Sequence, residues 1–159
     1  MRLFLDLLPE SGVTVTNVSR DQIGFQLAGP NARKVLEKVT REDVSNEAMP
    51  FRAVQRMNVG LTDALVCRVT YTGDLGYEMY VAPLEQAALY HALAEAGEEF
   101  GMRPFGMRAM MSLRLEKSFG SWLREYKPDY TAAETGLDRF ISFKKNDFIG
   151  RDAALKEKE

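Results

Sequence analysis

The chain has 159 residues, 45% of them hydrophobic, and a formal net charge of −2 from 21 basic and 23 acidic residues. This is the composition of one globular domain, so we expect a single domain over residues 1–159. There is no basic excess of the kind that nucleic-acid-binding proteins carry, and no apolar run approaches the roughly 20 residues of a membrane span. One cysteine excludes an internal disulfide, and the N-terminal run lacks a signal-peptide cleavage site. We therefore expect a cytoplasmic protein that binds neither nucleic acid nor membrane.

The first third of the chain predicts a short helix, extended segments and a second helix. Residues 3–8 are typical of the end of a helix that Pro9 terminates. Residues 13–18 alternate as a strand or an extended segment, and residues 23–27 as a short strand. A helix then begins after Gly29-Pro30, because proline is favoured in the first helical turn.

The middle of the chain predicts two strands over 51–60 and 62–71, a tight glycine turn, and a third strand that Pro83 ends. We expect Gly73 and Gly76 to bracket the turn, since glycine tolerates a positive φ. The alternation after the turn places Tyr77, Met79 and Val81 on one face and Glu78 with Tyr80 on the other. Glu78 is then either a solvated side chain on an open sheet face or a partnered carboxylate that serves a function.

Two helices are predicted next, over residues 84–100 and 105–117. We expect a buried stripe of Leu84, Ala88, Ala92, Ala96 and Phe100 on the first, widened by leucines beside it. The second helix carries apolar residues around most of its circumference and is expected to be largely buried. A buried Arg114 would then need a partner, which cannot be Glu116 because the two lie on different faces, so we expect a partner that is far away in the sequence.

The last third predicts an aromatic loop over residues 118–130, a short helix over 131–137, a strand over 139–143 and a terminal helix. The loop could form a pocket wall or simply pack as a long connection. His91 is the one histidine and has no neighbouring cysteine or carboxylate cluster, so we expect no metal site. The order of elements predicts an α+β fold: an antiparallel sheet with packed helices, ferredoxin-like.

Five motifs then carry a resemblance to a known family. They are residues 27–32 (LAGPNA), 71–78 (YTGDLGYE), 113–117 (LRLEK), 134–137 (ETGL) and 148–151 (FIGR). Together they resemble the folate-binding domain of the glycine cleavage aminomethyltransferase, the T-protein, from about Val13 onward. Residues 45–51 and 117–122 are more similar to the folate domain at the C-terminal end of dimethylglycine and sarcosine dehydrogenases.

The resemblance implies that the chain binds tetrahydrofolate and supports the transfer of a one-carbon unit. It assigns the pterin-binding carboxylate to Glu78, which could accept two N–H bonds from the aminopyrimidine edge, and it places Tyr71 in the same pocket. Plain T-proteins hold folate with an arginine at the position of Met110. Arg108 is the candidate substitute, although it points about 200° around the helix from Met110.

The resemblance also implies an incomplete chain, the second half of a folate domain. The family's catalytic aspartate belongs to a segment upstream of these residues, so we assign no catalytic residue and leave open whether the chain is an enzyme alone. We expect it to self-associate, or to pair with a complementary half-chain or a flavin-dependent dehydrogenase. Two alternatives to a folate-dependent transfer domain are a non-catalytic relative that acts as a binding or assembly module, and a general ferredoxin-like regulatory domain.

Overall fold

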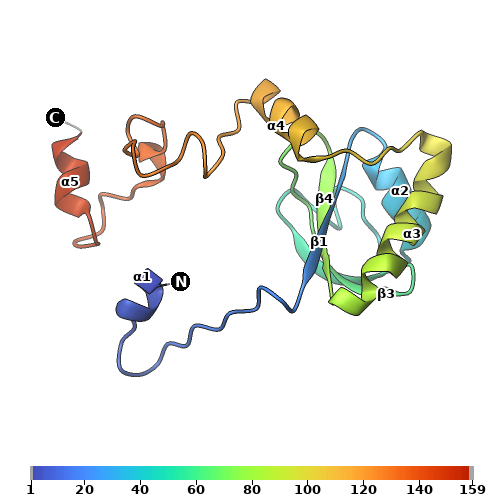
Figure 1. Cartoon of the computed structure of the whole chain (residues 1–159), viewed down its shortest axis with the longest axis horizontal. Coiled ribbons are helices and arrows are strands. Elements are labelled where there is room, and N and C mark those ends of the chain that lie inside the picture. The colour runs from blue at the N-terminus through green and yellow to red at the C-terminus, as the bar shows by residue number, and fades with distance from the viewer. Residues whose placement is uncertain (1, 158–159) are drawn as a thin grey trace. The chain divides into compact units, whose positions relative to one another are not determined.

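A computed structural model describes residues 2–157, and the side chains from residue 4 onward. It divides the chain into two compact units, residues 1–106 and residues 107–159, which are described separately below (Figure 1). The single domain expected over residues 1–159 stays a prediction.

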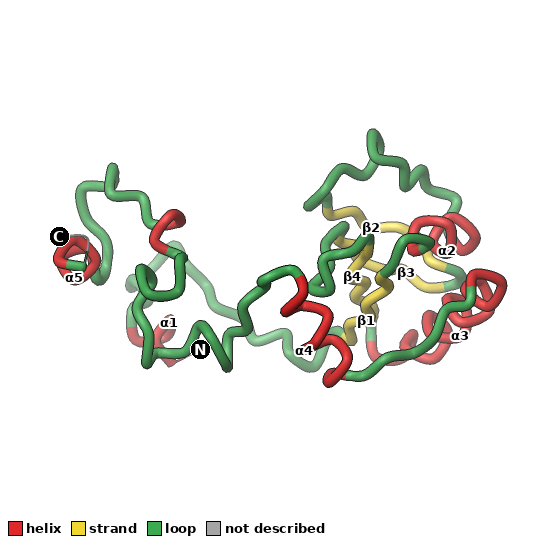
Figure 2. Tube along the Cα trace, turned by 90° about the horizontal axis from the view of Figure 1, so that it is seen from above, coloured by secondary structure: helices red, strands yellow, loops and turns green. Residues whose placement is uncertain are grey.

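The first unit is built on a four-stranded sheet, drawn in yellow in Figure 2. Its strands are β1 (Ile23–Ala28), β2 (Val54–Val59), β3 (Thr62–Cys67) and β4 (Gly76–Val81). Their order is β1-β4-β3-β2, and every neighbouring pair is antiparallel. The predicted α+β class, with an antiparallel sheet and packed helices, is confirmed. From β1 onward, the strands and α-helices of this unit follow one another in the order β-α-β-β-β-α.

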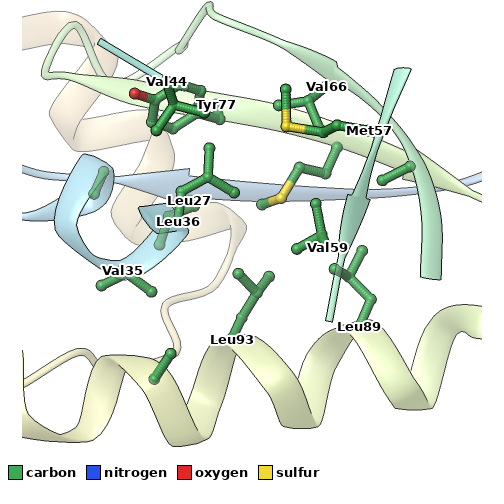
Figure 3. Close-up of a cluster of buried hydrophobic side chains, with 14 of the residues drawn as sticks. Leu27, Val35, Leu36, Val44, Met57, Val59, Val66, Tyr77, Leu89 and Leu93 are labelled. Carbon is green, nitrogen blue, oxygen red and sulfur yellow. The ribbon is translucent and has the colours of Figure 1, made fainter. Parts of the chain in front are cut away.

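Two helices pack on one face of the sheet, α2 (Ala32–Val39) and α3 (Gln86–Gly97). Short 3-10 helices flank α3 at η1 (Pro83–Glu85) and η2 (Glu98–Phe100). Figure 3 shows Leu89 and Leu93 rising from α3 toward Val59 of β2, with Leu36 of α2 beside them. Burying a leucine of this kind contributes about 1.5–3 kcal/mol. The core therefore lies between the helices and one sheet face, as the alternation of Tyr77, Met79 and Val81 predicts.

Several expectations for this unit differ from the structure in detail. Residues 13–18 form no strand, which leaves the alternative of an extended segment, and the preceding helix is present as α1 (Arg2–Asp6). The expected stripe holds only toward the C-terminal end of α3, because Ala96 is buried and Phe100 packs against the core, whereas Leu84 is 98% exposed. Leu89 and Leu93, the leucines that widen the stripe, are buried, and leucine removes more apolar area from water than alanine does.

The second unit contains α4 (Met107–Glu116), the 3-10 helix η3 (Asp138–Phe140) and α5 (Arg151–Lys156). The expected burial of α4 was wrong, since its one buried residue is Arg114. Residues 131–137 form turns rather than a helix, and residues 139–143 form no strand. The terminal helix is present as α5.

Arg114 is 2% exposed and is paired, as its burial requires. Its two terminal nitrogens donate to the two carboxylate oxygens of Glu125 at 2.8 and 3.0 Å, and Nη1 also donates to the carbonyl of Phe119 at 2.9 Å. The pair lowers the pKa of Glu125, chiefly through the hydrogen bond from Arg114. Arg114 is thus paired with a residue other than Glu116, as predicted, but the expectation of a partner far away in the sequence was wrong, because Glu125 lies only 11 residues further along the chain.

Candidate functional site

Glu78 lies in the middle of β4 on the sheet face that points away from α2 and α3. Its cross-strand neighbours are Gln26 on β1 and Cys67 on β3, and Tyr80 follows two residues later on the same face. We call this set, together with Leu65 opposite Tyr80, the outer face. Residues directly opposite one another in antiparallel strands share a face, so Gln26, Cys67, Glu78 and Tyr80 form one cluster of polar side chains on rigid backbone, with Leu65 at its border.

Both oxygens of the Glu78 carboxylate accept hydrogen bonds from the outer face. The Tyr80 hydroxyl donates to Oε2 at 2.7 Å, and Nε2 of Gln26 donates to Oε1 at 3.2 Å. Glu78 and Tyr80 are half-buried and Gln26 is exposed. The carboxylate is thus held in one orientation while part of it remains accessible.

The Glu78 charge changes the acidity of its neighbours. The hydrogen bond to Glu78, followed by burial and the charge itself, raises the pKa of Tyr80 to about 12. Burial, and secondly the charge of Glu78, raises the pKa of the Cys67 thiol. Around pH 7 both groups therefore keep their protons, and Tyr80 acts as a hydrogen-bond donor to the carboxylate.

Gly24 of β1 leaves space for the ring of Tyr80. A β-carbon at Gly24 would lie 3.1 Å from Cε1 of that ring, closer than ordinary van der Waals contact. The ring therefore lies against the bare backbone of β1, next to Gln26. This contact fixes the position from which the Tyr80 hydroxyl reaches Glu78.

The connection that leads into β4 is longer than expected. β3 ends at Cys67, and residues 68–75 form a loop instead of more strand and a tight turn. Gly73 has the predicted positive φ, +79°. Gly76 does not, but it is needed for another reason: a β-carbon there would lie 2.6 Å from the carbonyl oxygen of Leu27. The amide of Gly29 donates to the carbonyl of Leu75 at 2.8 Å, which ties this loop to the start of α2.

The predicted site residues fall in different parts of the chain. Tyr71 is half-buried in the loop before β4, and Glu78 lies on β4 itself. Arg108 lies on α4, in the second unit, with an exposed side chain, and Met110 is half-buried there. The assignments of Glu78, Tyr71 and Arg108 to a folate site stay predictions.

Sequence reasoning did not find Gln26 and Tyr80 as partners of Glu78. Alternation alone places Tyr80 on the same face of β4 as Glu78. On β1 it places Gln26 on the other face of the strand from Ile23, Phe25 and Leu27. The pairing of Gln26 with Glu78 joins residues 52 positions apart, so it depends on the strand register.

The described residues hold no group of three or more His, Cys, Asp or Glu side chains that could bind a metal ion. His91 instead packs edge-on against Tyr90, with ring centroids 5.5 Å apart. Among residues 2–157 no helix is both long enough and apolar enough to cross a membrane.

The comparisons with known proteins agree on one family. The family model described as the GCVT N-terminal domain matches residues 1–145. The mitochondrial dimethylglycine dehydrogenase of Homo sapiens is 41% identical over 143 residues, which are 89% of this chain and 16% of that protein. The aminomethyltransferase of Caldanaerobacter subterraneus subsp. tengcongensis is 35% identical over 147 residues, which are 92% of this chain and 39% of that protein.

One solved structure shows a similar fold. It is the heterotetrameric sarcosine oxidase from Corynebacterium sp. U-96 in complex with pyrrole 2-carboxylate. The match has a TM-score of 0.53 and 23% identity, and it covers 65% of this chain and 51% of that chain. The chain thus spans well under half the length of the curated relatives described above.

Proposed function

The chain belongs to the GCVT N-terminal domain family, a folate-dependent family of one-carbon transfer, and on this premise we propose that it binds tetrahydrofolate. The bound folate would accept the one-carbon unit of an aminomethyl or iminium intermediate as a methylene group, and the amine of that intermediate would leave. The donor would arise in glycine cleavage, as the resemblance to the T-protein implies, or in the oxidation of dimethylglycine or sarcosine, the compounds that appear in the names of a similar dehydrogenase and a similar oxidase.

The observation that carries this proposal is the Glu78 carboxylate on the outer face. A carboxylate has about four lone-pair positions, and Gln26 and Tyr80 use one on each oxygen. Each oxygen can therefore accept one further bond from a ligand. The aminopyrimidine edge of a pterin presents two adjacent N–H groups, and these match the two oxygens in a bidentate pair.

Two further residues are proposed to contact the folate. Tyr71 would pack its ring against the pterin or the aminobenzoyl group, from the loop that leads into β4. Arg108 would pair with a carboxylate of the folate glutamate, because its exposed guanidinium has no ion pair within the part of the chain that the structure describes. In this proposal the chain's own residues bind and orient the folate, and none of them is assigned a proton-transfer role.

The first test is calorimetric titration of tetrahydrofolate into the wild type and into Glu78→Gln. Glutamine removes the charge and replaces one acceptor with a donor. Hydrogen bonds to charged groups contribute about 1.5–3 kcal/mol, and mispairing adds a desolvation cost, so affinity should fall roughly ten- to a few hundredfold.

The matched control for this test is Glu37→Gln, which makes the same change at an exposed position of α2. It should bind folate as the wild type does. Equal affinities of Glu78→Gln and wild type would remove Glu78 from the site. Loss of the cooperative thermal transition in Glu78→Gln would instead give the carboxylate a structural role.

A second candidate function is an assembly module that retains the fold without binding folate. It is favoured by the exposed apolar side chains of the second unit, among them Trp122 and Leu123 at 77% and 84% exposed. Its partner would be a second copy, a complementary half-chain or a flavin-dependent dehydrogenase. Absence of folate binding together with tight association would favour this function.

The cytoplasmic location also stays a proposal. The Homo sapiens relative is named as a mitochondrial protein.

A further inference from the structure

The outer face presents more than the two acceptor atoms of Glu78. A carboxylate can only accept hydrogen bonds, so the group of Gln26 that faces Oε1 of Glu78 at 3.2 Å must be its NH₂ group. That NH₂ group has two N–H donors, and the bond to Glu78 uses one of them. The outer face therefore offers a ligand two acceptors, Oε2 and Oε1 of Glu78, followed by one donor, an N–H of Gln26.

We propose that Gln26 is a specificity-determining residue, which reads the substituent at carbon 4 of the pteridine beside the edge that Glu78 binds. The inference rests on the proposed folate function and names the chemical class that the site selects: 4-oxo pteridines over 4-amino pteridines. A 4-oxo pteridine presents an NH₂ group, an N–H and a carbonyl in a row. This donor, donor and acceptor order is the complement of the outer face.

The arrangement orients the pteridine in one direction only. Gln26 lies beside Oε1, so the ring N–H must meet Oε1 for the neighbouring carbonyl to reach Gln26, and the NH₂ group must then meet Oε2. A 4-amino pteridine places a donor against the donor of Gln26. Two facing donors leave both desolvated and unpaired, which costs more than the loss of one neutral hydrogen bond.

Tyr80 is a positioning residue in this arrangement. Its single hydroxyl proton is donated to Oε2 of Glu78 at 2.7 Å, and its ring is seated over Gly24. It therefore has no second proton for a ligand. It holds the carboxylate, while Gln26 both holds it and contacts the ligand.

The test is to titrate tetrahydrofolate and its 4-amino-4-deoxy analogue into the full chain by calorimetry and to compare the ratio of the two affinities between variants. The wild type should prefer tetrahydrofolate. Gln26→Met keeps the length of the side chain and removes the donor. It should lower the affinity for tetrahydrofolate about two- to tenfold, which is the contribution of one neutral hydrogen bond. The affinity for the analogue should rise relative to the affinity for tetrahydrofolate. The neutral analogue also lacks the ring N–H that meets Oε1 of Glu78, but this difference between the two ligands is the same in the wild type and in the variant, so the change in the ratio isolates Gln26.

Asn58→Met is the matched control, because Asn58 is an exposed amide on β2, the strand at the opposite edge of the sheet from β1. It should leave the ratio unchanged. Gln26→Thr provides a second variant that favours a strand and is too short to reach the ligand, and it should behave as Gln26→Met does.

An unchanged ratio in Gln26→Met and Gln26→Thr, in chains that bind tetrahydrofolate and lose affinity in Glu78→Gln, would overturn this inference alone. Failure of the wild type to bind tetrahydrofolate at all would overturn the proposed function and this inference with it. A ratio that falls equally in Asn58→Met would also overturn the inference, because the effect would then not be local to Gln26.

Discussion

At the scale of single residues, the hydrogen bond between Tyr80 and Glu78 can be followed through the ionisation of the phenol. The pKa of Tyr80 is raised to about 12, chiefly by that hydrogen bond. The chain has six tyrosines, so the difference between the ultraviolet pH titrations of the wild type and Tyr80→Phe isolates this one. The difference should titrate near 12. In the Glu78→Gln background the same difference should move down toward the ordinary value of 10.0, and a titration that does not move would contradict the role of Glu78.

The same shift makes stability depend on pH in a known direction. The unfolded chain loses the Tyr80 proton near 10, whereas the folded chain keeps it until about 12. Between these values the folded state binds more protons, so the stabilisation present below pH 10 is lost as pH rises. Urea midpoints measured at several pH values should therefore fall more steeply for the wild type than for Tyr80→Phe within this window.

At the scale of elements, the contact between β1 and β4 requires a glycine at the start of β4. A β-carbon on Gly76 would lie 2.6 Å from the carbonyl oxygen of Leu27 and 3.0 Å from Cβ of Thr70. Backbone atoms cannot move aside as the end of a flexible side chain can. Gly76→Ala should therefore destabilise the chain by about 1–3 kcal/mol, the usual cost of overpacking, as measured by urea unfolding.

Gly106→Ala is the control for this measurement. A β-carbon at Gly106 meets no atom within 4 Å, and its φ is not positive. It should change stability little or increase it slightly, because alanine reduces the conformational freedom of the unfolded chain. Equal effects of the two substitutions would show that the contact between Gly76 and Leu27 is unimportant.

The sequence predicts those parts of the fold that depend on local periodicity. The two-residue alternation of β4 is local, and it correctly separates Tyr77, Met79 and Val81 from Glu78. The partner of Glu78 on β1 is set by the pairing of strands that lie far apart in sequence, and no local pattern contains that register. The burial of α4 was wrong because apolar residues around a helix do not say which other element covers them.

For Arg114, a simple physical rule correctly predicted from the sequence alone that the side chain is paired. A buried guanidinium must be paired, and the geometry of a helix excludes Glu116. The rule does not name the partner, which is Glu125 in the turns after α4. The loop of residues 118–130, predicted to be a pocket wall or a packed connection, therefore supplies the carboxylate that pairs with Arg114.

At the scale of the whole molecule, the two units differ in how well they bury their apolar residues. The first unit has a core of sixteen buried hydrophobic residues between its helices and its sheet. Every one of them lies within residues 27–96, and the described residues of the second unit contribute none. Both units expose large apolar side chains, but the second unit exposes them along its length without such a core. They are Met107, Leu115, Phe119, Trp122, Leu123, Tyr130, Phe140 and Ile149.

Exposed apolar side chains in this number drive association, so we expect the chain to form dimers or larger oligomers with a second copy through residues 107–159. Sedimentation velocity over a range of concentrations should show a sedimentation coefficient that increases with concentration. Trp122→Ser combined with Leu123→Ser removes two of the most exposed apolar side chains of this unit and should shift the equilibrium toward monomer. Phe51→Ser, at a 70% exposed position of the first unit, should not. A monomer at every concentration would show that the second unit does not mediate self-association, and an equal shift in Phe51→Ser would place the contact elsewhere.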